Sequence, residues 1–207
     1  MAEEKNSYLK EEENPPVSTG DGAFGEDGAE NTENAPKPEY VPKTKHEKAL
    51  YEVYTNEASA TVLKVASAAI VALTAFAFAV HLLALILTDV ILFIETLIIT
   101  GVPFIAVSVM RIIVDAPRPY EVLEFYKKRP KGKTGRSFPS RHVFSVFVIG
   151  TVLVPYETVL GISLLCLGVF LGSFRVLLGI HFRKDVIAGA LIGVISGVIG
   201  HLAILFI

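Results

Sequence analysis

Five apolar segments dominate this sequence, and their lengths restrict what the chain can fold into. They cover residues 60–88, 90–110, 142–154, 158–178 and 186–207. A helix needs about 20 apolar residues to cross a bilayer, and runs longer than that are not found in helices of soluble cores. We therefore predict an all-α fold, a polytopic membrane helix bundle of five transmembrane helices. A sixth is expected if residues before Ala60 also enter the bilayer.

The N-terminal part of the chain has a different composition. Residues 1–48 contain 6 Lys and 12 Asp or Glu, a net charge of −6, and very few aliphatic residues. Such a segment cannot bury enough apolar surface to offset its chain entropy. We predict a disordered acidic tail over residues 1–45 and a membrane-embedded domain over residues 46–207. Within that domain, residues 46–59 are expected to form a short amphipathic helix on the membrane surface.

The positive charges of the membrane domain gather on one face. Counting the crossings places the long polar loop, residues 115–137, on the same face as the short loop at 179–184. The other face carries the tight turns at 88–89 and 155–157. The remaining 13 of the 19 Lys and Arg residues all lie at the long-loop face or at helix ends opening onto it. Either that face is cytoplasmic, or it holds a binding site for a multiply charged anion.

Six of these basic residues crowd the long loop itself. They form either an electrostatic funnel for anionic lipid headgroups or an ordinary solvated loop that signals topology. Nucleic acid is not an expected partner, because a loop tethered to the membrane lacks the folded elements that read bases. The six residues are Lys127, Lys128, Arg129, Lys131, Lys133 and Arg136.

The last of three polar segments at this face pairs a histidine with an aspartate. His181 and Asp185 are four residues apart, so on a helix they share a face. The carboxylate can accept a hydrogen bond from one imidazole nitrogen, which leaves the other nitrogen with a free lone pair. A nucleophile or base held by an orienting group has this form. Arg175 closes the preceding span, and Gly179 provides a bend that turns Arg175 and His181 towards one point.

The middle polar segment opens a helix. Pro139 and Ser140 begin it, and helix N-termini bind phosphate through unpaired N–H groups and a positive dipole end. Ser140 is a good N-cap, and its hydroxyl could also donate to a phosphate oxygen. His142, in the first turn, is well placed to act as a general acid for a leaving oxygen.

The first polar segment contributes two guanidinium groups. Arg111 and Arg118 are seven residues apart, two helical turns, and Pro117 and Pro119 end the helix there. The planar fork of arginine matches phosphate oxygens. We therefore expect arginines, histidines and a helix N-terminus to converge on one membrane face, as a phosphoryl transition state requires.

Together these segments resemble the signature motifs of the type 2 phosphatidic acid phosphatase superfamily. That family includes lipid phosphatases, undecaprenyl diphosphate phosphatases, bacterial acid phosphatases and vanadium haloperoxidases. Its pattern is Lys-x6-Arg-Pro, Pro-Ser-Gly-His and Ser-Arg-x5-His-x3-Asp, and the resemblance covers residues 90–201. It implies that His181 takes the phosphoryl group, Asp185 orients it, and His142 protonates the leaving group. It implies no metal or other cofactor, and it assigns the phosphate oxygens to Arg111, Arg118, Ser140 and Arg175.

Three positions depart from the family pattern. Arg111 stands in place of Lys, Arg141 in place of Gly, and Phe174 in place of Ser, with Ser173 one position earlier. Two interpretations of Arg141 are open. Its guanidinium could bind a second phosphate, which would favour a diphosphate substrate, or its long side chain could extend away from the site into solvent.

The resemblance implies a multi-pass protein of a bacterial plasma membrane that hydrolyses a lipid phosphate or diphosphate through a phosphohistidine intermediate. Phosphatidate and polyprenyl diphosphates are the substrate types expected, and the partners are the lipid substrate and the bilayer. Many bacterial members have an extracytoplasmic site, whereas the bias of Lys and Arg favours the cytoplasm. The main alternative is a transporter or channel for a phosphorylated solute, although no discontinuous helix pair or internal repeat is visible.

Three ionisable residues lie inside the apolar segments, away from these motifs. His81, Glu95 and His201 are each six or seven residues from the tight-turn face, which puts them roughly 9–10 Å deep. Ionisable groups inside a membrane usually face protein and pair with one another. We predict that Glu95 packs near His81 or His201.

Overall fold

The computed structural model describes residues 51–52, 56–122 and 134–204. All regular structure in these ranges is helical, in agreement with the predicted fold class. The predicted acidic tail and most of the predicted surface helix lie outside the described residues. The helices are α3 (Glu57–Thr88), α4 (Val90–Val114), α5 (Pro119–Val122), α6 (Arg141–Leu153), α7 (Thr158–Leu177) and α8 (Arg183–Ile204).

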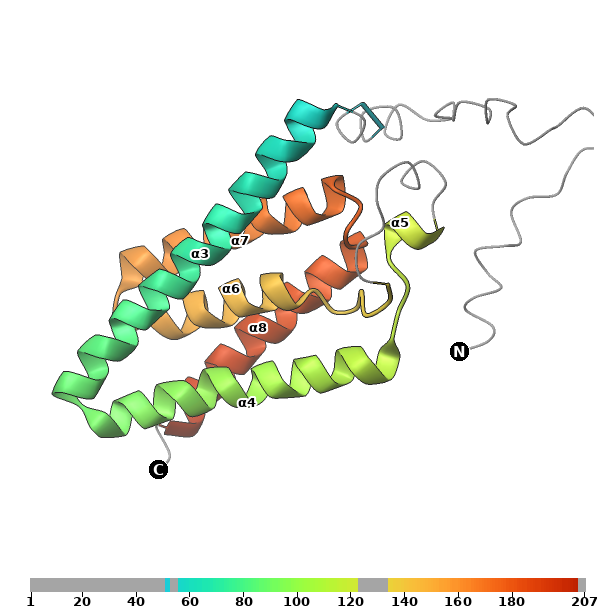
Figure 1. Ribbon diagram of the computed structural model, residues 1–207. Coiled ribbons are helices and arrows are strands. Elements are labelled where there is room, and N and C mark those ends of the chain that lie inside the picture. Colours follow the sequence, from blue (N-terminus) through green and yellow to red (C-terminus); the bar gives the residue numbers. More distant parts are fainter. Residues whose placement is uncertain (1–50, 53–55, 123–133, 205–207) are drawn as a thin grey trace, which may run out of the picture. The chain divides into compact units, whose positions relative to one another are not determined.

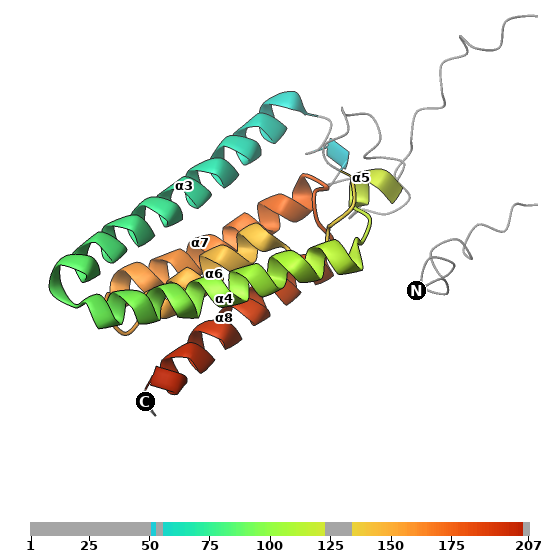
Figure 2. The ribbon, with the colours of Figure 1, turned by 60° about the horizontal axis from the view of Figure 1, so that its bottom comes forward.

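The turn between α3 and α4 is built by a single residue, Asp89. Its backbone N–H donates to the Leu85 carbonyl at 2.7 Å and ends α3. Its side chain accepts from the Leu92 N–H at 3.0 Å and starts α4. The two helices form a hairpin whose arms diverge away from this turn (Figures 1 and 2).

Among the described residues, four helices, α3, α4, α7 and α8, are long and apolar enough to cross a membrane. Many of their large apolar side chains are exposed, among them Leu87, Ile91 and Val159. In water such a surface would be unfavourable, but in a bilayer it faces lipid tails. The protein is therefore a multi-pass integral membrane protein.

Helix α6 is the exception among the five predicted spans. Its 13 residues extend only about 20 Å, less than the hydrocarbon core of a bilayer. It packs against α3, α4, α7 and α8, and Figures 1 and 2 show it enclosed among the last three of these. Val143, Phe144 and Leu153 are fully buried. Since protein rather than lipid surrounds α6, it need not match the thickness of the membrane.

Close packing between α6 and α8 depends on glycines of α8. A Cβ atom added at Gly193 would lie 2.8 Å from the Phe144 carbonyl oxygen, and one at Gly189 would lie 2.6 Å from the Ser140 carbonyl oxygen. Both neighbours are backbone atoms that cannot turn aside. Small residues at such positions let helix backbones approach closely inside a membrane.

We expect Gly193→Ala to destabilise the bundle by about 1–3 kcal/mol, because the added methyl must push two backbones apart. Thermal unfolding of the purified protein in detergent micelles measures the effect as a lower Tm. Gly101→Ala is the matched control, since a Cβ there meets nothing within 4 Å. Equal Tm values for the two variants would contradict this account of the packing.

Two of the intramembrane ionisable residues, His81 and His201, lie near the α6–α7 turn, at the end of the bundle opposite the polar motifs. His81 is buried, and its Nδ1 lies 3.3 Å from Glu157 Oε1. The Tyr156 ring lies between two histidines, 5.6 Å from the His81 ring and 5.7 Å from the His201 ring. Burial raises the pKa of the Tyr156 phenol, and the charge of Glu95 adds to this effect. The partner of His81 is thus a turn residue, and close packing of Glu95 against a histidine stays a prediction.

Candidate active site

The polar motifs come together at one end of the bundle. Helix α4 ends there, α6 begins there, and the α7–α8 turn closes the same end (Figure 1). The residues contributed are Arg111 from α4, Arg118 before α5, Ser140, Arg141 and His142 at the start of α6, Arg175 from α7, His181 from the turn and Asp185 from α8. Residues distant in the sequence therefore share one membrane face, as predicted.

The α7–α8 turn places His181 next to Arg175. Gly179 adopts a left-handed conformation with φ of 65°, which glycine accepts without strain. The chain then folds back, so that the N–H groups of Ile180 and His181 both donate to the Arg175 carbonyl, at 3.0 and 3.3 Å. The predicted bend at Gly179 is confirmed. The prediction that His181 shares a helix face with Asp185 is wrong, because α8 begins only at Arg183.

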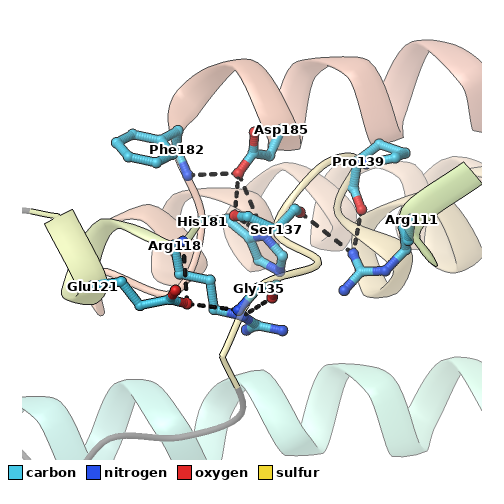
Figure 3. Close-up of polar contacts among 9 residues, drawn as sticks. All are labelled: Arg111, Arg118, Glu121, Gly135, Ser137, Pro139, His181, Phe182 and Asp185. Carbon is cyan, nitrogen blue, oxygen red and sulfur yellow. Dashed lines mark hydrogen bonds and ion pairs between the residues drawn. The ribbon is translucent and has the colours of Figure 1, made fainter. Parts of the chain in front are cut away.

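The histidine and the aspartate are linked through a third side chain. His181 Nδ1 and Asp185 Oδ2 are 3.7 Å apart, too far for a direct hydrogen bond. The Ser137 hydroxyl lies between them, 3.3 Å from Nδ1, and donates to Oδ2 (Figure 3). The Phe182 N–H donates to the same oxygen at 3.0 Å. Sequence reasoning missed Ser137, since a serine in a polar loop carries no periodic or spacing signal.

Burial controls the protonation of His181. Only 2% of the residue is exposed. Burial lowers the pKa of the imidazole, and the positive charges of Arg118 and Arg111 act in the same direction, while Asp185 opposes them. A histidine with a lowered pKa is neutral at physiological pH, as a nucleophile must be.

The two arginines of the first motif hold the segment that carries Ser137. The Arg111 guanidinium donates to the Pro139 carbonyl and, at 3.4 Å, to the Ser137 carbonyl. Arg118 Nε donates to the Gly135 carbonyl at 2.9 Å. The Glu121 carboxylate accepts from the Gly135 N–H at 2.8 Å and from the Arg118 N–H at 3.3 Å. These contacts, drawn in Figure 3, hold the segment 135–139, which leads into α6.

At the start of α6, Ser140 is fully buried and occupies the N-cap position. Its side chain does not cap the helix, contrary to one of the two roles predicted for it. Its N–H donates to the Asp185 carbonyl at 2.9 Å, which ties α6 to α8. The Ser140 hydroxyl and Arg175 Nε are buried without a hydrogen-bond partner among the described residues. Both atoms are therefore available to an oxyanion.

His142 and Arg141 complete the set. His142 is partly buried, and burial together with the charges of Arg175 and Arg141 lowers its pKa to about 4. Arg141 is exposed, and its guanidinium carbon lies 5.7 Å from the centroid of the Phe104 ring of α4.

In the described ranges, no three His, Cys, Asp or Glu residues are grouped so that they could hold a metal ion.

A known structure shares this arrangement of helices. LpxE from Aquifex aeolicus superimposes with a TM-score of 0.57 at 22% identity, over 78% of this chain and 98% of that protein. A transmembrane PAP2-type phosphatidylglycerolphosphate phosphatase from Bacillus subtilis gives a TM-score of 0.47 at 20% identity, over 74% of this chain and 90% of that protein.

Sequence comparisons extend the similarity. The bacitracin transport permease protein BcrC of Bacillus licheniformis is 34% identical over 79 residues, which are 38% of this chain and 39% of that relative. The family model of the PAP2 superfamily matches residues 89–205, more than half of the chain. That match includes the end of α4, the start of α6 and the α7–α8 turn, the three places that bring the polar residues together. The chain is therefore a member of the PAP2 superfamily.

Proposed function

We propose that this protein is a membrane phosphatase that hydrolyses a lipid phosphate or diphosphate through a phosphohistidine on His181. One observation supports this more than any other. Arg175 Nε and the Ser140 hydroxyl are buried and unpaired among the described residues, at the end of the bundle that holds the buried His181. Buried polar atoms are normally hydrogen-bonded. A phosphate oxyanion would satisfy both atoms beside the nucleophile.

In the first step, His181 Nε2 attacks phosphorus. The new N–P bond forms as the bond between phosphorus and the leaving oxygen breaks, and the leaving oxygen takes that electron pair. His142 supplies the proton that this oxygen needs. The negative charge of the bound phosphate opposes the burial and the arginine charges that lower the pKa of His142, and so favours its protonated form. Arg175, Arg118 and the Ser140 hydroxyl stabilise the charge that develops on the equatorial oxygens.

In the second step, water attacks the phosphohistidine. His142, now neutral, removes a proton from the water as the new O–P bond forms. The N–P bond breaks, its electron pair returns to Nε2, and inorganic phosphate leaves. The neutral His181 and the protonated His142 needed for the next turnover are both restored, the latter with the proton taken from water.

A lipid substrate is supported by the surroundings of the site. Ile112 and Ile113, next to Arg111 in the sequence, are exposed apolar residues of a membrane helix. The acyl or prenyl chain of a lipid can lie against them while its phosphate reaches the arginines. The headgroup then enters the site from the interface and stays in the bilayer.

The test is phosphate release by the purified protein in detergent micelles from phosphatidate, phosphatidylglycerophosphate and undecaprenyl diphosphate. At least one of these should release inorganic phosphate at a catalytic rate, and a chelator in the assay shows whether any metal is needed. The absence of release from all three would overturn the proposal.

Transport is the second candidate, because the matched relative is named a transport permease. A transporter would move a phosphorylated solute across a liposome membrane with the phosphoester intact, and His181→Ala would still do so. A phosphatase would release inorganic phosphate and lose that activity in the same variant.

Arg141 is expected to select for diphosphates. When a diphosphate is cleaved the leaving group is itself a phosphate monoester, and Arg141 adjoins His142, the residue that protonates it. Loss of one charge-assisted contact should make Arg141→Gly lower the rate on a polyprenyl diphosphate about 10-fold relative to phosphatidate. Lys64→Ala, an exposed basic residue of α3, is the control. An unchanged substrate ratio in Arg141→Gly would show that this side chain only extends into solvent.

A further inference from the structure

The Ser137 hydroxyl links the nucleophile to the carboxylate, and it is fully buried. Both of its backbone groups are also held. Its N–H donates to the Ala116 carbonyl at 2.9 Å, and its carbonyl accepts from Arg111. The hydroxyl is therefore set in place by the first motif rather than by the helix that carries Asp185.

Counting protons on this hydroxyl decides its role. A serine hydroxyl has one hydrogen, and here that hydrogen goes to Asp185 Oδ2, since an ionised carboxylate can only accept. Towards His181 Nδ1 the serine oxygen can then only accept, so Nδ1 must carry a hydrogen. The lone pair of the ring is left on Nε2. We infer that Ser137 is a positioning residue that fixes the reactive tautomer of His181 and connects it to Asp185.

This inference rests on the proposed function and adds a step to it. As Nε2 bonds to phosphorus, the imidazole becomes positively charged. The Nδ1–H bond to Ser137 then strengthens, and the serine dipole transmits the stabilisation to the Asp185 carboxylate. No proton has to leave the chain of three groups. Ser137 acts at the transition state, whereas substrate binding depends on the arginines.

The first test needs no substrate. In ¹⁵N NMR spectra of histidine-labelled protein in micelles, the His181 signals, assigned by their loss in His181→Ala, should show the Nδ1–H tautomer. In Ser137→Ala they should shift towards a mixture of tautomers. A wild-type His181 with its hydrogen on Nε2 would overturn the inference. The NMR result for the His181 tautomer is valid even if no phosphatase activity is found. The role of Ser137 and the proposed function can therefore be refuted independently of each other.

The second test is kinetic. Ser137→Ala should lower kcat about 10- to 100-fold, because it removes a hydrogen bond to a developing charge. KM should change less than about 3-fold, since the arginines remain. Ser173→Ala is the matched control, because that exposed hydroxyl only bonds the Val169 carbonyl within its own helix. An unchanged kcat in Ser137→Ala, or an effect confined to KM, would overturn the inference.

A double variant separates positioning from general support of the fold. If Ser137 acts through Asp185, then adding Ser137→Ala to Asp185→Asn should cost less than about 2-fold beyond Asp185→Asn alone. Losses that multiply would mean that the two residues act independently, contrary to the inference. Should Ser137→Ala prove unstable, Ser137→Cys replaces it, since a thiol keeps similar bulk but is a weak donor.

Discussion

His181→Ala is expected to reduce phosphate release by at least about 10,000-fold, the largest effect of any substitution in the chain. Its imidazole is the proposed attacking group, and no other described side chain has the same combination of burial and support by Asp185 through Ser137. Burial and the nearby arginine charges keep the pKa of His181 low, so the wild-type ring is neutral and reactive at physiological pH.

The measurement is release of inorganic phosphate, combined with trapping of the intermediate from a radiolabelled substrate by an alkaline quench, which preserves phosphohistidine. Wild-type protein should carry label and His181→Ala should not. His201→Ala is the control, because that ring lies at the opposite end of the bundle against Tyr156 and the Val152 carbonyl. Label retained by His181→Ala would contradict the assignment of the nucleophile.

Arg175→Ala is expected to lower kcat about 100- to 1,000-fold, the usual effect of removing one preorganised donor from a transition state. Its Nε is buried without a partner among the described residues, and its charge lies near that of Arg118. A buried N–H without a partner is unfavourable. We therefore attribute its position to the oxyanion that it would bind during catalysis.

Two comparisons sharpen that prediction. Arg175→Lys should recover only part of the activity, because an ammonium group lacks the planar fork that binds two phosphate oxygens. Arg175→Ala should not lower the Tm, since it removes a largely buried positive charge beside Arg118. Activity of Arg175→Ala within about 3-fold of wild type would exclude a role at the transition state.

The ends of the long helices could be predicted closely from the sequence. Helices α3 and α7 begin and end within a few residues of the predicted spans, because apolar runs bounded by polar or turn residues are local features of the chain. The polar residues that the structure brings together could also be picked out, since arginine pairs, a Pro-Ser helix start and a histidine four residues from an aspartate are local patterns. The prediction that these residues lie at one membrane face followed from counting how often the chain crosses the membrane.

Other features depended on contacts between distant segments. Helix α6 is surrounded by four other helices, which its own apolar pattern does not reveal. His81 meets Glu157, 76 positions away, and Ser137 meets His181, 44 positions away.

What the sequence alone determined is which residues can do chemistry and at which membrane face they lie. That prediction needs only the lengths of the apolar runs and the spacing of nearby polar residues, and both are properties of a local stretch of chain. The tertiary structure decided how the residues are connected: that Ser137 joins Asp185 to His181, and that Arg111 and Arg118 hold the loop that carries it. Such bonds depend on how helix ends pack in three dimensions, and no local pattern of the chain encodes that packing.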